Sequence, residues 1–139
     1  MKKPFVITLD HTLLVKQSGS ENNKQATLQN LAIMMTEMKN KLPVTFIILT
    51  QLNREIDDPE RQKPTGSADV MIAFNRPAKY NLGLYGPNKY VIDDKFLLAM
   101  HILKNRFGDV GIQWYRAEYA KMTIVEAPTP STRIISSSS

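Results

Sequence analysis

The sequence predicts an α/β fold with a partly parallel sheet, a long flanking helix, and antiparallel strands in the last third. Two apolar runs, 4–10 and 44–49, are separated by a stretch of helical periodicity, which indicates a β-α-β unit with parallel strands. Beyond residue 95, short apolar segments separated by turn residues are typical of antiparallel strands. We expect one partial domain over 1–127 and a disordered, low-complexity tail over 128–139.

The composition is that of a globular domain. With 139 residues, 42% of them hydrophobic, the chain can bury roughly two thirds of its unfolded surface. It has no apolar run near the roughly 18 residues of a membrane span and no signal peptide, so we expect a cytoplasmic protein without membrane contact. The absence of cysteine excludes disulfides and thiolate metal sites. The net charge of +5 is compatible with a phosphate-bearing partner but does not identify one.

The first predicted strand, 4–10, ends in Asp10. In nucleotide hydrolases an aspartate at the carboxyl end of such a strand holds Mg²⁺, usually through water. A short apolar strand followed by an aspartate is also common by chance, so a strand that simply ends at Asp10 is the alternative. The polar, Gly- and Ser-bearing segment 13–23 is predicted to be a loop, in which Lys16 is available for a phosphate contact.

A helix is predicted from about 24 to 41. Apolar residues recur along it at helical spacing and form one stripe: Leu28, Leu31, Met35, Met38 and Leu42. Pro43 ends this helix and begins the run 44–49, which we expect to be a strand buried on both faces. Because the two predicted strands are parallel, Asp10 and Gln51 are expected at the same edge of the sheet.

Polar side chains follow the second predicted strand: Thr50, Gln51, Asn53 and Arg54. Ligands of parallel sheets bind just outside the carboxyl ends of the strands. An amide at that edge can orient a water or sense a phosphate, and a guanidinium can clamp an anion. The alternative is a polar strand exit with no binding role.

The rest of the chain is predicted to alternate strands and turns. We expect a third buried strand over 68–74, a short strand within 90–92, and antiparallel strands from residue 96 onward. The turn residues near 109–111 predict a hairpin, with Lys104 and Arg106 projecting from its tip. If these two cations only face solvent at a turn, they are surface charges without a function.

Taken in order, these segments resemble the carboxyl-terminal motor domain of hexameric replicative DNA helicases of the DnaB type, whose core is RecA-like. VITLD at 6–10 looks like the Walker B strand of that family, and LTQLNRE at 49–55 is nearly identical to its third helicase motif. LKNRFG at 103–108 resembles the hairpin that reaches into the ATP site of the neighbouring subunit. ADV at 68–70 resembles the strand that follows the fourth motif of the family.

The resemblance implies the motor of an ATP-dependent replicative DNA helicase, possessing a RecA-like fold, with ATP and Mg²⁺ as cofactors. Its neighbouring identical subunits form a ring, a hexamer in that family. By the same resemblance, Asp10 is the metal-binding aspartate, and Thr50 and Gln51 lie beside the γ-phosphate. Lys104 and Arg106 act in trans on the neighbouring subunit's ATP. The residues that would contact single-stranded DNA are Lys16, Gln17, Ser18, Asn53 and Arg54.

The sequence also departs from that family. It contains no G-x-x-x-x-G-K-[ST], so the loop that cradles the phosphates is missing. The glutamate that activates water in the family, normally on a strand before Walker B, is missing as well. The segment 55–68 is short for the family, as in a trimmed chain or a divergent phage-type enzyme. We therefore expect half of a motor domain that is inactive by itself.

Two further classes of function remain open. The chain can be a non-catalytic RecA-like module that binds a partner subunit or single-stranded nucleic acid, which the missing phosphate loop favours. A nuclease built on Asp10, Asp57, Asp58 and His101 has acidic residues but no spacing that supports it. His101 falls within an apolar strand, where we expect a histidine satisfied in the core and not a metal ligand.

Overall fold

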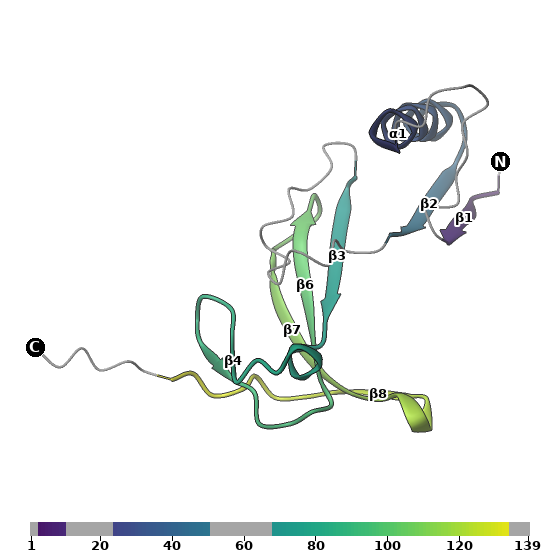
Figure 1. Ribbon diagram of the computed structural model, residues 1–139. Coiled ribbons are helices and arrows are strands. Elements are labelled where there is room, and N and C mark those ends of the chain that lie inside the picture. The colour runs from purple at the N-terminus through teal and green to yellow at the C-terminus, as the bar shows by residue number, and fades with distance from the viewer. Residues whose placement is uncertain (1–2, 11–23, 51–67, 134–139) are drawn as a thin grey trace, which may run out of the picture. The chain divides into compact units, whose positions relative to one another are not determined.

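The computed structural model describes residues 3–10, 24–50 and 68–133. The chain divides into two compact units, Met1–Asn53 and Arg54–Ser139. The first unit holds a parallel strand pair and a helix, and the second holds a four-stranded antiparallel sheet and a small two-stranded sheet (Figure 1). Parallel pairing early in the chain and antiparallel pairing late in it are what the sequence predicts.

The first unit is the predicted β-α-β unit. Its elements are β1 (Phe5–Asp10), α1 (Lys24–Lys41) and β2 (Val44–Leu49). β1 and β2 pair in parallel from Phe5 opposite Val44 to Asp10 opposite Leu49. This register brings the carboxyl ends of both strands to the same edge of the sheet.

The end of α1 follows from local chemistry. Lys39 and Lys41 lie in its last turn, where positive charge is favourable beside carbonyl groups that have no helical partner. Leu42 donates its backbone N–H to the Met38 carbonyl at 2.8 Å, which closes the final turn. Pro43 follows and cannot donate the next hydrogen bond, so the chain leaves the helix and enters β2.

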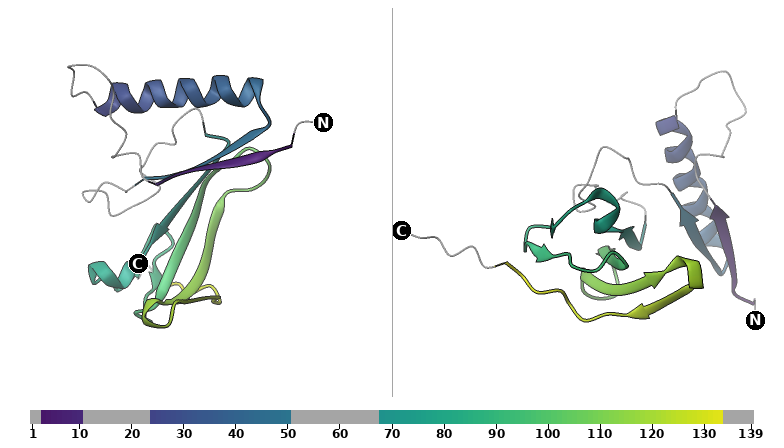
Figure 2. Two further views of the ribbon diagram at one scale, coloured as in Figure 1. Left: turned by 90° about the vertical axis from the view of Figure 1, so that its right-hand side faces the viewer. Right: turned by 60° about the horizontal axis from the view of Figure 1, so that its bottom comes forward.

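Among the described residues of this unit, α1 covers one face of the two parallel strands. Exposed and half-buried positions alternate from Val6 to Asp10 and from Thr45 to Leu49, and α1 lies on one side of the pair (Figure 2). On the uncovered face Val6, Ile47 and Leu49 are 60%, 49% and 47% exposed. The prediction that β2 is buried on both faces is therefore wrong, because no described element of this unit lies against that second face.

The second unit is built on an antiparallel sheet. It contains β3 (Val70–Asn75), β6 (Leu97–Asn105), β7 (Gly111–Glu118) and β8 (Thr123–Glu126), in the order β3-β6-β7-β8. β6 and β7 form the predicted hairpin. β3 is the strand predicted at 68–74, but its burial alternates, with Ala73 buried and Ile72 and Phe74 exposed. Continuous burial of this strand was wrongly predicted, since β3 is an edge strand with one packed face.

Short elements connect these strands. They are a 3₁₀ turn at Pro77–Tyr80, β4 (Leu84–Tyr85), β5 (Tyr90–Val91) and a second 3₁₀ turn at Tyr119–Lys121. β5 is the predicted short strand, whereas β4 was not predicted. Val91 donates its backbone N–H to the Ser131 carbonyl at 2.8 Å. The first part of the predicted disordered tail therefore pairs with β5, and residues 134–139 lie outside the described part.

An aromatic cluster forms the core of the second unit. Tyr85, Leu97, Ala99 and Trp114 are buried together. The ring of Trp114 makes edge-on contacts with Tyr85 and Tyr90, at centroid distances of 5.8 and 5.3 Å. Edge-to-face pairs of this kind stabilise a core beyond their buried area. The cluster holds β4 and β5 against the middle of the antiparallel sheet.

No helix within the described ranges combines the length and apolar character that crossing a membrane requires.

The uncovered face of the β1–β2 pair predicts self-association of the isolated chain. Ile47→Thr keeps a β-branched side chain but removes apolar surface, so we expect it to lower the oligomeric fraction in sedimentation velocity at equal concentration. Glu37→Thr, at an exposed position within α1, is the matched control and should sediment like the wild type. Equal association of Ile47→Thr and wild type would show that another surface mediates it.

Candidate functional site

The first candidate feature lies at the carboxyl edge of the β1–β2 pair. Asp10 is the last residue of β1 and stands opposite Leu49, the last residue of β2. Thr50 follows directly, and both Asp10 and Thr50 are exposed. The parallel register therefore brings a carboxylate and the start of the Thr-Gln segment to one accessible edge, as predicted from the strand order.

Several predicted residues around this edge lie outside the described part of the chain. They are Lys16, Gln17, Ser18, Gln51, Asn53 and Arg54, together with Asp57 and Asp58 of the nuclease alternative. Their expected roles stay predictions.

The second candidate feature is the tip of the β6–β7 hairpin. Arg106 begins the turn after β6, and its side chain is 69% exposed. Lys104 does not project from the tip as expected, because it lies inside β6, opposite Met71 of β3, and is half-buried. Lys104 and Arg106 are thus close in sequence but differ in environment: the lysine is half-buried in β6, and the arginine is exposed in the turn.

Asp69 holds Arg106 in two ways. The backbone N–H of Arg106 donates to the Asp69 carbonyl at 2.9 Å. The Nη1 of Arg106 also donates to Oδ1 of Asp69 at 3.0 Å, forming an ion pair between residues 37 positions apart. The tip is therefore attached to the beginning of β3 by main chain and side chain together.

The side chain of Asn105 orders the turn itself. Its Oδ1 accepts the backbone N–H of Phe107 at 3.1 Å, and its Nδ2 donates to the Asp109 carbonyl at 3.2 Å. A Cβ at Gly108 would stand 3.2 Å from that Nδ2, which is tighter than ordinary contact. Glycine at 108 thus leaves room for the Asn105 side chain to span the turn, which gives the glycine that follows the Lys-x-Arg segment a physical reason.

His101 is a core residue, as the sequence predicts. It is 2% exposed, and its Nε2 lies 2.6 Å from the hydroxyl of Tyr85. The two rings also meet edge-on at 5.6 Å. Within the described residues, no group of three or more histidine or carboxylate side chains is arranged to hold a metal ion.

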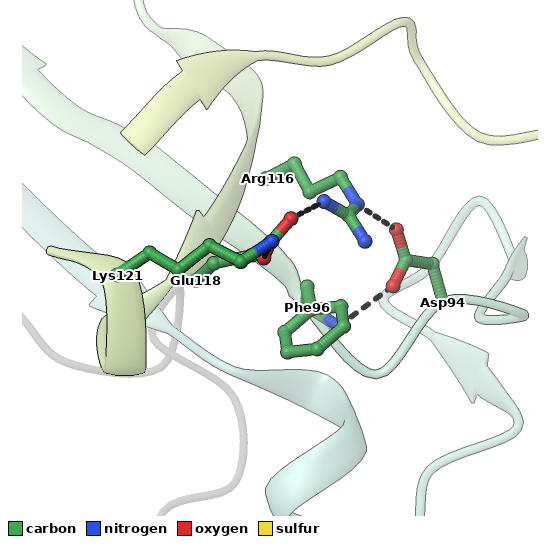
Figure 3. Close-up of polar contacts among 5 residues, drawn as sticks. All are labelled: Asp94, Phe96, Arg116, Glu118 and Lys121. Atoms are coloured by element: carbon green, nitrogen blue, oxygen red, sulfur yellow. Dashed lines mark hydrogen bonds and ion pairs between the residues drawn. The ribbon is translucent and has the colours of Figure 1, made fainter. Parts of the chain in front are cut away.

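A charged network that the sequence analysis did not identify crosses the β7–β8 corner (Figure 3). Arg116 donates from Nε to Oδ2 of Asp94 at 3.0 Å and from Nη1 to Glu118. Lys121 pairs with the other oxygen of Glu118 at 2.7 Å. The guanidinium also lies over the ring of Phe96, 4.6 Å from its centroid. The network joins the loop before β6 to the far end of β7.

These contacts shift the ionisation of both partners. Hydrogen bonds from Lys121 first, and Arg116 second, lower the pKa of Glu118 below its ordinary value. Hydrogen bonds to Glu118 and then to Asp94 raise the pKa of Arg116. Because the guanidinium of Arg116 contacts two carboxylates and an aromatic ring, we assign this network a structural role. Arg106, by contrast, contacts one carboxylate within the described residues, that of Asp69.

The first unit thus contains a parallel strand pair, and the second contains an antiparallel sheet with the β6–β7 hairpin. The chain is similar to a solved structure described as an ATPase domain, with a TM-score of 0.68 and 18% identity. That match covers 91% of this chain and 45% of the other. The predicted fold class, and the likeness in fold to a motor domain of the DnaB type, are confirmed.

A second solved structure supports the same fold. It is described as a DnaB-like replicative helicase and its interactions with primase, and it matches with a TM-score of 0.61 and 18% identity. The match covers 84% of this chain and 29% of that one, so the chain spans less than half the length of both structures. No family model and no curated protein sequence matches the chain.

The Glu118 network predicts a pH-dependent contribution to stability. The pKa of Glu118 is lower in the folded chain than in the unfolded chain, so its stabilising effect is full above the ordinary value of 4.5. It is lost as the pH falls through the lowered folded value. Glu118→Gln should therefore lower the melting temperature at pH 7, and this difference should vanish in acid.

The matched control is Glu126→Gln, an exposed position on β8, whose melting temperature should follow the wild type across the pH range. A Glu118→Gln difference that stayed constant from pH 7 into acid would contradict an electrostatic origin.

Proposed function

We propose that this chain is the carboxyl-terminal half of the motor of an ATP-dependent replicative DNA helicase. The observation that carries the proposal is the parallel register of β1 and β2, in which Asp10 stands opposite Leu49, next to Thr50. A nucleotide hydrolase needs a carboxylate and a water- or phosphate-sensing group at this edge of a parallel sheet. The likeness in fold to ATPase domains supports the same assignment.

Asp10 has the chemistry that Mg²⁺ requires. Its carboxylate is exposed at the end of β1, and Mg²⁺ is usually held by one or two carboxylates together with substrate phosphates and water. A single carboxylate at this edge is consistent with that pattern. Bound Mg²⁺ would neutralise charge on the phosphates of ATP.

The other residues would act on the phosphates and the attacking water. In this proposal Thr50 and Gln51 lie beside the γ-phosphate, where the amide orients water and reports the nucleotide state. Lys104 and Arg106 would serve the ATP site of the neighbouring subunit, where cations stabilise charge on the transferring phosphoryl group. Activity would then depend on assembly of identical subunits into a ring, which we propose to be a hexamer in the cytoplasm.

Single-stranded DNA would be the nucleic acid along which this motor moves. The residues proposed to contact it are Lys16, Gln17, Ser18, Asn53 and Arg54. Lysine, arginine and small polar side chains can follow a phosphate backbone without reading its sequence, and such contacts weaken as salt is added. The net charge of +5 is compatible with this partner.

A second function is favoured by one sequence observation. The chain has no phosphate loop, which a hydrolase of this fold requires. A non-catalytic RecA-like module, binding a partner subunit or single-stranded nucleic acid, needs no such loop. The two functions differ in one outcome: the helicase half restores ATP hydrolysis when combined with a phosphate-loop half, and the module does not.

Arg106→Ala tests the proposed trans-acting arginine. In a complete motor, where this chain is combined with a phosphate-loop half, we expect ATP turnover to fall by about 10³-fold or more. Nucleotide affinity should change little, because the residue contributes to the neighbouring site only as the phosphoryl group transfers. Turnover and equilibrium nucleotide binding are measured on the same preparations.

The matched control is Arg133→Ala, at an exposed arginine outside the hairpin, which should leave turnover unchanged. Loss of nucleotide binding together with turnover would mean that Arg106 has a structural role. Wild-type turnover by Arg106→Ala would remove the arginine from the mechanism.

A further inference from the structure

We propose that Asp69 is a positioning residue for Arg106, and that it fixes the direction in which the guanidinium leaves the hairpin tip. The inference rests on the proposed function, since it names how the trans-acting arginine is prepared for the neighbouring ATP site. Asp69 lies just before β3 and is far from the tip in sequence, so only the fold brings the two residues together.

Arg106 and Asp69 make two contacts with separate effects: one attaches the turn, and the other orients the guanidinium. The main-chain hydrogen bond from Arg106 N–H to the Asp69 carbonyl, at 2.9 Å, attaches the turn to β3 and does not depend on the side chain of residue 69. The ion pair from Arg106 Nη1 to Asp69 Oδ1, at 3.0 Å, acts on the guanidinium itself. Removing the carboxylate therefore releases the arginine side chain while the turn stays attached.

The ion pair leaves most of the guanidinium usable. Arginine carries five N–H donors, and the described contacts engage Nη1 with one carboxylate oxygen. The side chain remains 69% exposed, whereas that of Asp69 is 30% exposed. Donors on the outer side are thus available for an incoming phosphate, and the carboxylate holds the long side chain in one direction before the phosphate arrives.

Arg116 shows what a purely structural arginine looks like in the same sheet. It also pairs with an aspartate at 3.0 Å, but in addition it contacts Glu118 and lies over the ring of Phe96. Arg106 has neither a second carboxylate nor an aromatic ring among its described contacts. The ordered turn built by Asn105 and the single side-chain contact to Asp69 therefore present Arg106 outward, as a preorganised group.

The ion pair has little effect on folding. Pairs between solvent-exposed charges contribute little to stability, so a chain without the Asp69 carboxylate stays folded. A change in ATP turnover on removal of the Asp69 carboxylate can therefore be distinguished from a loss of folding. The pair Asp94–Arg116, with the same 3.0 Å distance, is the matched control because it lies in the same unit but outside the hairpin tip.

The first experiment measures steady-state ATP hydrolysis in the complete motor. Asp69→Ala should lower kcat about 10²-fold while KM stays within about twofold, as expected when a reacting group is misplaced by about 1 Å. Asp69→Asn retains a hydrogen-bond acceptor and should recover part of the loss. Asp94→Asn should retain the wild-type kcat.

Comparison with Arg106→Ala makes the outcomes distinguishable. Adding Asp69→Ala to Arg106→Ala should cause no further loss, because the two residues act as one unit. Wild-type kcat for Asp69→Ala, alongside loss for Arg106→Ala, overturns this inference and leaves the proposed function standing. Wild-type kcat for Arg106→Ala overturns both. Loss of nucleotide binding in Asp69→Ala also overturns the inference, because it indicates a structural role.

A second readout needs only the full chain by itself. Nitrogen-15 relaxation of the Arg106 Nε–H group should show increased side-chain motion in Asp69→Ala, while the Arg106 backbone amide stays protected from hydrogen exchange. Equal Nε–H motion in the variant and the wild type would overturn the positioning role of Asp69, whatever the ATP hydrolysis measurements give.

Discussion

The hydrogen bond between the Tyr85 hydroxyl and Nε2 of His101, 2.6 Å long and buried, joins β4 to β6, one of the two inner strands of the antiparallel sheet. β6 pairs with β3 on one side and β7 on the other, so the strand that carries His101 also sets the positions of its neighbours. The edge-on packing of Tyr85 on Trp114 adds an aromatic contact from β7. Because β6 is held in this way, its end, where Arg106 begins the turn, has a defined place in the unit.

The proposed chemistry is divided between the two units of the chain. The first unit supplies a carboxylate at the edge of a parallel sheet, and the second supplies an arginine on an anchored hairpin. Neither unit contains a phosphate loop in its sequence. A motor built from this chain thus needs a second polypeptide segment to bind the phosphates and a neighbouring copy to receive the arginine. The uncovered face of the β1–β2 pair is the part of the first unit whose apolar surface remains exposed.

Local patterns were sufficient to predict the elements but not the contacts between distant residues. The spacing of apolar residues and Pro43 indicated the bounds of α1 and β2, and turn residues located the β6–β7 hairpin. Burial on both faces of β2 could not be judged, because an apolar run does not reveal whether the rest of the sheet is present. The Asp69–Arg106 pair joins residues 37 apart, and the Arg116–Asp94 contact joins β7 to the loop before β6, so no local sequence pattern predicts either contact.

The most direct test of the central claim is ATP hydrolysis by this chain, alone and combined with a phosphate-loop half, with and without single-stranded DNA. We predict no turnover by the chain alone in either condition, because the phosphate loop and its lysine are missing. DNA-stimulated turnover is expected once the phosphate-loop half is added. Turnover by the chain alone would mean that other residues bind the phosphates, and it would contradict the roles assigned to Asp10 and Gln51.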